Sequence, residues 1–139
     1  MAVWTFYDYV ELTGSNPIRK WLDSLPPEAE ARIDYRLQQM EGMSRWPEKW
    51  VSKYKGTKEI FELRICHNKV QYRPLGTYLG VKQFILLKGA IEKGDKIPKS
   101  DIETAESRLA SVKKETRHVQ FHQYDSPDDL EEDEAEDLS

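Results

Sequence analysis

The chain has 139 residues, of which 38% are hydrophobic and 33% are charged, and its formal net charge is −4. This length suffices for one hydrophobic core and is too short for two comfortable domains, so we expect a single domain. The single Cys66 excludes an intramolecular disulfide framework, no Cys/His cluster has metal-ligand spacing, and no apolar run reaches membrane-spanning length.

The first ten residues, MAVWTFYDYV, lack the charged and long apolar regions of a signal peptide. Together with the exclusions above, this predicts a cytoplasmic protein with no membrane contact, no metal and no cofactor. Aromatic and β-branched residues at 4–10 predict a first strand. Asn16 is expected to cap a short helix over 18–25, with Pro17 in the first helical position.

A second, amphipathic helix is predicted over 28–43. Pro26 and Pro27 end the preceding helix and suit the start of another, because proline is tolerated in a first turn but not in a helix interior. Ile33 and Leu37 recur at helical spacing. We expect the two helices to form a structural hairpin against a sheet; the alternative is that an exposed edge of this pair is a groove that binds a partner.

Three strand-like runs occupy the middle of the chain, at 60–66, 70–75 and 81–87. They are rich in β-branched and aromatic residues, and turn formers separate them: Asn68 after the first run and the segment GTYLG after the second. This pattern predicts an antiparallel meander.

The alternation of side chains along a strand places charge on one face of this meander. Glu62 and Arg64 share a face opposite Leu63, and Arg73 lies opposite Tyr72 in the next run. One face is expected to be core and the other a working surface. Because the two runs are adjacent, Arg64 and Arg73 are expected to point to the same side, which makes an anion site plausible.

Lysines cluster in the loops on either side of the meander. Before it they surround Gly56, and after it they lie in or beside the loop GAIEKGDKIPKS; the residues are Lys53, Lys55, Lys58, Lys88, Lys93, Lys96 and Lys99. Solvated side chains are the ordinary interpretation, and a phosphate-binding role is the alternative that the nearby Arg64 favours. A final amphipathic helix over 102–114 should pack on the domain.

Charge is divided unevenly along the chain. The first 118 residues contain all 21 Lys and Arg and 16 of the Asp and Glu, a balance of +5, whereas the rest contains nine acids and no Lys or Arg. We therefore predict a basic domain at 1–117 and an acidic, disordered tail at 118–139. The tail has three open interpretations: a solubilising end, a nucleic-acid mimic that covers the basic domain, or a docking segment for a partner.

An ordered set of short motifs over residues 3–115 resembles the RelE/HigB-like toxin superfamily, specifically its phage-derived branch. Members have a strand with ELR, a strand with YR, an LL strand, a lysine-bearing loop and a helix with an A-x-x-R signature. Here these are Glu62-Leu63-Arg64, Tyr72-Arg73, Leu86-Leu87, Lys93, and Ala105 with Arg108. The resemblance implies an α+β fold: two N-terminal helices on a curved, mainly antiparallel sheet of four or five strands, then a C-terminal helix.

The resemblance also implies a function. Toxins of this superfamily cleave mRNA, usually in the ribosomal A site and without a metal, and a cognate antitoxin that often has a helix-turn-helix domain neutralises them. In such cleavage the ribose 2′-OH attacks the adjacent phosphorus and gives a 2′,3′-cyclic phosphate, which requires a base, an acid and cations around the phosphorane. The expected partners are therefore mRNA, the ribosome and an antitoxin.

Four residues become candidate catalytic groups through this resemblance. Arg64 and Arg73 are expected to clamp the scissile phosphate, because a guanidinium offers planar bidentate donors. Lys93 corresponds to one of a lysine pair after the LL strand. Glu62 is a candidate base or, alternatively, a structural partner of the two arginines. The candidate RNA-binding residues are two aromatics that can stack on bases and three cations: Tyr54, Tyr78, Lys53, Lys55 and Lys88.

The loop after the LL strand departs from the superfamily pattern. Many relatives have His, Gly, Phe and two lysines there, whereas this chain has KGAIEK from Lys88 to Lys93. His67 falls in a predicted turn, and His118 and His122 lie past the matched range, where surface histidines are expected. The alternative function is therefore a phage- or prophage-derived module of the same fold that binds RNA or a protein without catalysis.

Overall fold

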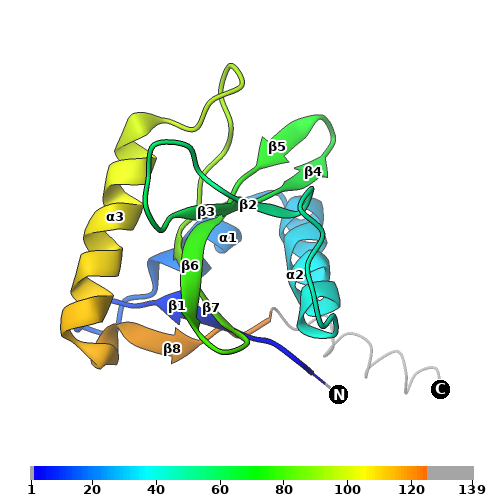
Figure 1. The fold of residues 1–139 in the computed structure, drawn as a ribbon. Helices are drawn as coiled ribbons and strands as arrows, with labels where there is room; N and C mark the ends of the chain where they lie inside the picture. Colours follow the sequence, from blue (N-terminus) through cyan, green and yellow to red (C-terminus); the bar gives the residue numbers. More distant parts are fainter. Residues whose placement is uncertain (1, 125–139) are drawn as a thin grey trace.

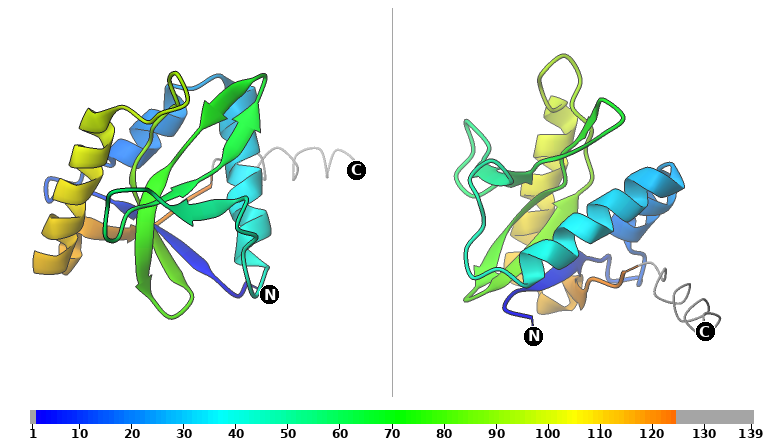
Figure 2. Two further views of the ribbon diagram at one scale, coloured as in Figure 1. Left: turned by 45° about the horizontal axis from the view of Figure 1, so that its top comes forward. Right: turned by 90° about the vertical axis from the view of Figure 1, so that its right-hand side faces the viewer.

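Helices cover both faces of a central sheet (Figure 1). The computed structural model describes residues 2–124. Its elements are, in chain order, β1 (Thr5–Tyr9), α1 (Pro17–Asp23), α2 (Pro27–Glu41), β2 (Val51–Lys53), β3 (Phe61–Leu63), β4 (Ile65–His67), β5 (Val70–Tyr72), β6 (Leu75–Gly80), β7 (Gln83–Lys88), α3 (Lys99–Lys114), the 3-10 helix η1 (Thr116–His118) and β8 (Val119–Phe121). Helices α1 and α2 pack on one face and α3 on the other (Figure 2). The predicted α+β class, with two N-terminal helices and a C-terminal helix, is confirmed.

Within residues 2–124, the main sheet has six strands in the order β2-β3-β6-β7-β1-β8. Neighbouring strands of this sheet are antiparallel, except for β1 and β7, which are parallel to each other. The predicted mainly antiparallel sheet is therefore confirmed, with six strands where four or five were expected. Strands β4 and β5 form a separate hairpin, so the chain leaves the sheet after Leu63 and re-enters it at Leu75.

The predicted helical pair forms for the local reasons found in the sequence. The Asn16 side chain accepts a hydrogen bond from the Arg19 N–H at 2.9 Å, and Pro17 begins α1. The two helices bury an apolar stripe against Phe6 and the other side chains of this sheet face; its members include Ile18, Leu22, Ile33, Leu37 and Met40. This stripe makes the first hydrophobic core.

The segment GTYLG was predicted to be a turn, and this prediction is wrong. It lies within β6, which pairs with β7. Gly76 is needed because the two strands approach closely: a Cβ at this position would lie 2.1 Å from the Ile85 carbonyl oxygen. The turn follows instead at Val81 and Lys82, where Lys82 has a φ of +58°.

The sheet face that carries Ile60 and Glu62 was expected to be a working surface, but α3 covers much of it. Apolar side chains of this face and of α3 form a second buried cluster, which includes Ile60, Leu75, Ile85, Leu87, Ala105 and Leu109. Both faces of the sheet therefore carry a hydrophobic core, and the polar residues of this face lie beside packed apolar ones.

The sheet continues past residue 117, the predicted end of the domain. Strand β8 pairs antiparallel with β1, the His118 Nδ1 lies 2.8 Å from the Val10 carbonyl oxygen, and the His122 N–H donates to the Phe6 carbonyl at 3.0 Å. The expectation that His118 and His122 are surface residues is wrong, because both are buried. The rest of the predicted tail, residues 125–139, lies outside the described residues.

His122 lies between two buried carboxylates. Its Nδ1 is 2.7 Å from Asp8 Oδ1 and its Nε2 is 3.3 Å from Asp34 Oδ1. The Asn16 amide donates to Asp8 Oδ2 at 2.9 Å, and the Tyr124 ring packs edge-on to the imidazole. Burial disfavours the imidazolium, but the hydrogen bonds and charges of Asp34 and Asp8 outweigh it and raise the pKa of His122 to about 9.

This cluster predicts that the protein loses stability in alkaline solution. Because folding raises the pKa of His122 from 6.5 to about 9, its stabilisation is fully present below pH 6.5 and disappears as the pH rises through about 9. The full contribution is on the order of 3 kcal/mol. Urea unfolding between about pH 6 and about pH 10 should therefore show a falling free energy of unfolding.

The variant His122→Gln isolates this contribution. It removes the cation between Asp8 and Asp34, so its free energy of unfolding at neutral pH should be lower by about 3 kcal/mol. The alkaline decrease should be smaller than in the unmodified protein. A variant whose stability follows the same pH curve as the parent would contradict the assignment of this dependence to His122.

Candidate functional site

Arg64 and Arg73 stand at the two points where the β4–β5 hairpin joins the main sheet. Arg64 lies between β3 and β4, and Arg73 lies between β5 and β6. The Leu63 N–H donates to the Pro74 carbonyl at 2.9 Å, which ties the two junctions together. The hairpin therefore brings the two arginines, which are nine positions apart in the chain, to the same place.

Both guanidinium groups reach the carboxylate of Glu62. Arg64 Nη2 lies 3.1 Å from Glu62 Oε2, and Arg73 Nε lies 3.5 Å from Glu62 Oε1. Glu62 itself is buried. Each carboxylate oxygen of Glu62 thus faces one arginine. The sequence left two roles open for Glu62, a catalytic base or a structural partner of the arginines, and these contacts are those of a structural partner.

The two arginines differ in exposure. The Arg73 side chain is 10% exposed, and its Nη2 lies 3.5 Å from Glu92 Oε2 and 3.1 Å from Gln71 Oε1. The Arg64 side chain is 41% exposed, and its guanidinium pairs with Glu62. Arg64 is therefore the arginine that a ligand in solution can reach, whereas Arg73 lies behind it with two acidic neighbours.

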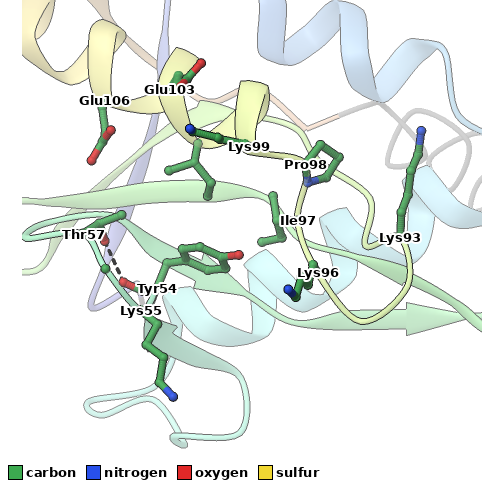
Figure 3. Close-up of a pocket in the computed structure, with 12 residues that line it drawn as sticks. Tyr54, Lys55, Thr57, Lys93, Lys96, Ile97, Pro98, Lys99, Glu103 and Glu106 are labelled. Atoms are coloured by element: carbon green, nitrogen blue, oxygen red, sulfur yellow. Dashed lines mark hydrogen bonds between the residues drawn. The ribbon is translucent and has the colours of Figure 1, made fainter.

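A pocket of about 620 Å³ opens beside α3, and Figure 3 shows its lining residues. Its walls come from three segments: the loop after β2, the loop between β7 and α3, and the first turns of α3. Four exposed lysines line it: Lys55, Lys93, Lys96 and Lys99. Within residues 2–124, none of these four amines forms an ion pair with a carboxylate.

A tight turn holds two of these lysines opposite each other. The Lys93 N–H donates to the Lys96 carbonyl at 2.7 Å, and the Lys96 N–H donates to the Lys93 carbonyl at 3.0 Å. Gly94 and Asp95 between them have φ values of 57° and 65°, the pattern of a two-residue hairpin turn. The turn is thus fixed by its backbone and presents a pair of like charges.

The arginines and the lysine pocket are neighbours on the α3 side of the sheet. Glu92, which lies 3.5 Å from Arg73, directly precedes Lys93 of the pocket. On the other side of the pocket, the Tyr54 N–H donates to the Ile60 carbonyl at 2.7 Å, two residues before Glu62. Of the predicted residues, Arg64 and Arg73 both contact Glu62, and Tyr54, Lys55 and Lys93 line the pocket. Lys53 precedes Tyr54 in the chain and is not among the lining residues.

Two predicted RNA-binding residues have other surroundings. Tyr78 lies in an aromatic cluster, with its ring centroid 4.9 Å from that of Phe61 and 5.8 Å from that of Trp46, and burial raises the pKa of Tyr78. Lys88 Nζ lies 3.7 Å from Asp101 Oδ1 on α3. The structure places neither side chain among the residues that line the lysine pocket.

The sequence prediction of the site omitted Glu92, Gln71, Lys96 and Lys99. Glu92 lies in the loop where many relatives carry two lysines, and its contact with Arg73 gives it a structural role. Gln71 lies two residues before Arg73, and strand alternation is the signal that could have found their contact. The two lysines had been counted in the loop, but nothing local distinguished them from solvated lysines.

Residues 2–124 lack two further features, a membrane-spanning helix and a metal-binding cluster. None of their helices combines the length and apolar character needed to cross a membrane. In the same residues, no three His, Cys, Asp or Glu side chains are grouped so as to hold a metal ion.

Comparison with known protein families identifies the family of this chain. Residues 20–110, about two thirds of the chain, match the family described as phage derived protein Gp49-like (DUF891). The chain belongs to this Gp49-like family. No curated protein matches it. The match supports the phage-derived part of the resemblance found in the sequence.

The Gp49-like range contains the whole candidate site but, of the His122 cluster, only Asp34. Both arginines, Glu62 and the lysine-bearing loops fall within residues 20–110, whereas β1 and β8 fall outside it. The part of the chain that defines the Gp49-like family is thus the part that carries the grouped cations.

The shared carboxylate predicts a difference between two glutamates. Glu62→Gln should lower the free energy of unfolding by about 1–3 kcal/mol, because it leaves the buried Arg73 guanidinium with less compensating charge. Glu59 is the matched control: it lies 2.8 Å from Lys113, but both side chains are exposed. Glu59→Gln should cost at most about 0.5 kcal/mol. Equal losses in urea unfolding would show that Glu62 is not a buried ion-pair partner.

Proposed function

We propose that this Gp49-like protein is the toxin of a type II toxin-antitoxin system and a metal-independent mRNA endonuclease that acts in the cytoplasm, at the ribosome. The observation that carries the proposal is the half-exposed Arg64, held by a buried Glu62 that is also bound to Arg73, next to a pocket lined by lysines. Family membership supports a phage-derived toxin at the coarser level.

The chemistry that suits these residues is phosphodiester cleavage by the neighbouring 2′-OH. Charge develops on the phosphate oxygens during the attack, and fixed cations stabilise it most where water is partly excluded. Arg64 is assigned to the phosphate oxygens because its guanidinium is the more exposed of the pair. Lys55 and Lys93 supply further positive charge, and Lys93 is the assigned proton donor to the leaving 5′ oxygen.

Glu62 is assigned to positioning and not to proton abstraction, and the 2′-OH proton passes to a solvent water as the 2′ oxygen attacks phosphorus. A general base must have an oxygen directed at the hydroxyl that it deprotonates. Both Glu62 oxygens instead face guanidinium groups, at 3.1 Å and 3.5 Å. The geometry therefore supports Glu62 as the group that orients Arg64 and compensates the charge of Arg73.

The proposal predicts that inducing the chain in bacteria arrests growth and produces new mRNA ends with 2′,3′-cyclic phosphates. Arg64→Ala should relieve the arrest and reduce cleavage about 100-fold, the usual cost of losing one charge-stabilising donor. Arg73→Ala should relieve both as well, with an added loss of stability. Co-expression of a cognate antitoxin with a helix-turn-helix domain should also restore growth.

The matched control is Arg117→Ala, because Arg117 is exposed and follows the far end of α3. It should arrest growth as the parent does. Undiminished arrest and cleavage by a folded Arg64→Ala protein would rule out this site as the nuclease centre.

One observation favours a second candidate function, a non-catalytic module of the same fold that binds RNA or a protein. His118 and His122 are buried in contacts with β1 and α2, so neither is available to the candidate site as an acid or base. Glu62 and Glu92 also offset part of the positive charge of the arginines. RNA binding without any cleavage on translating ribosomes would select this function over the nuclease.

A further inference from the structure

The lysine pocket has the composition of a nucleotide subsite. Its volume, about 620 Å³, lies within the range of small-molecule sites. Figure 3 shows the Tyr54 ring and Ile97 facing each other near its centre, with Pro98 beside them. A half-buried aromatic ring beside an apolar wall offers a base the stacking surface that single-stranded RNA uses on proteins.

The Tyr54 ring is presented by a rigid loop. The Thr57 hydroxyl donates to the Tyr54 carbonyl at 2.7 Å and to the Ile60 carbonyl at 3.2 Å, and Gly56 takes a φ of +87° to make the bend. The Tyr54 N–H is bound to the Ile60 carbonyl in addition. Because the backbone on both sides of Tyr54 is held, stacking a base on its ring needs little further ordering of the loop.

Charge in the pocket is arranged in two sides. Lys55 and Lys96 lie on the loop side, whereas α3 contributes Glu103 and Glu106 together with Lys99, whose side chain lies beside Glu103 (Figure 3). The backbones of Lys93 and Lys96 pair across their turn, and their side chains point in different directions (Figure 3). None of the loop lysines is compensated by a carboxylate within residues 2–124. An anion bound on the loop side would supply the missing negative charge.

We infer that this pocket binds one nucleotide of single-stranded RNA, with its base on Tyr54, its phosphate on Lys55 and Lys96, and the polar edge of its base toward Glu103 and Glu106. Carboxylates repel the phosphate, so they orient the nucleotide. They also accept hydrogen bonds from an exocyclic amino group, as acidic side chains do from cytosine N4. Uracil has carbonyl oxygens on both sides of its N3–H, so the pocket favours cytosine over uracil. The inference rests on the proposed action on RNA and adds a site that selects a base.

The test uses 2′-O-methyl RNA hexamers, which bind but cannot be cleaved by 2′-OH attack. Fluorescence anisotropy of the full chain at low salt should show tighter binding of a uridine hexamer with one central cytidine than of the all-uridine hexamer, by about fivefold. Tyr54→Ala should weaken binding of the cytidine hexamer about tenfold, the loss of one stacked base, and Tyr54→Phe should keep it. Lys96→Ala should make binding less dependent on salt.

Two controls separate the pocket from general effects. Tyr35 is exposed on α2, and Tyr35→Ala should bind as the parent does. The double variant Glu103→Gln, Glu106→Gln should bind both hexamers and lose the preference for cytidine. Parent-like binding by a folded Tyr54→Ala protein, or an equal loss in Tyr35→Ala, would overturn the pocket as a base-binding site.

The outcome for the pocket is distinct from the outcome for the nuclease. Tyr54-dependent binding by a protein that never cleaves RNA in cells would support the pocket and remove the proposed endonuclease. Cleavage that depends on Arg64 together with hexamer binding that ignores Tyr54 would do the reverse.

Discussion

The contact of Glu62 with Arg64 and Arg73 is the interaction on which the candidate site depends. Two guanidinium groups at neighbouring positions repel each other, and the repulsion grows as water is excluded. A carboxylate between them converts this repulsion into attraction to a shared anion. Arg73 depends on it more than Arg64 because it is the buried member of the pair. The arrangement leaves one guanidinium inside and the other half exposed.

Chain topology creates this contact. The inserted β4–β5 hairpin, in which Ile65 pairs with Tyr72, makes the preceding Arg64 and the following Arg73 neighbours at its base. The same junction directs the chain toward the loop of Glu92 and Lys93, since the Arg73 N–H donates to the Ala90 carbonyl at 2.8 Å.

Buried and exposed charges have different partners in this molecule. The His122 imidazole is enclosed by Asp8 and Asp34, so its charge stabilises the attachment of β8 to the body of the fold. The pocket lysines are exposed and have no such partners among the described residues. Compensated charge thus belongs to the scaffold, and uncompensated positive charge gathers where three loops and helix ends meet (Figure 3). This contrast distinguishes charged side chains with a structural role from the lysines that are available to bind a polyanion.

Local chemistry in the sequence determined the helix start at Asn16 and Pro17 and the placing of Arg64 and Arg73 on one side, because each depends on neighbours within a few residues or on strand alternation. The fold class came from the family resemblance of the sequence. Only the tertiary structure decided that GTYLG is a strand, since the close approach at Gly76 comes from the backbone of β7. It alone decided that His122 is buried, since its two carboxylate partners are 114 and 88 residues away. It also decided which arginine is exposed and which lysines share a pocket with Tyr54. Periodicity reports the direction of a side chain along its own element, whereas burial and ion pairing depend on which distant segment packs over it.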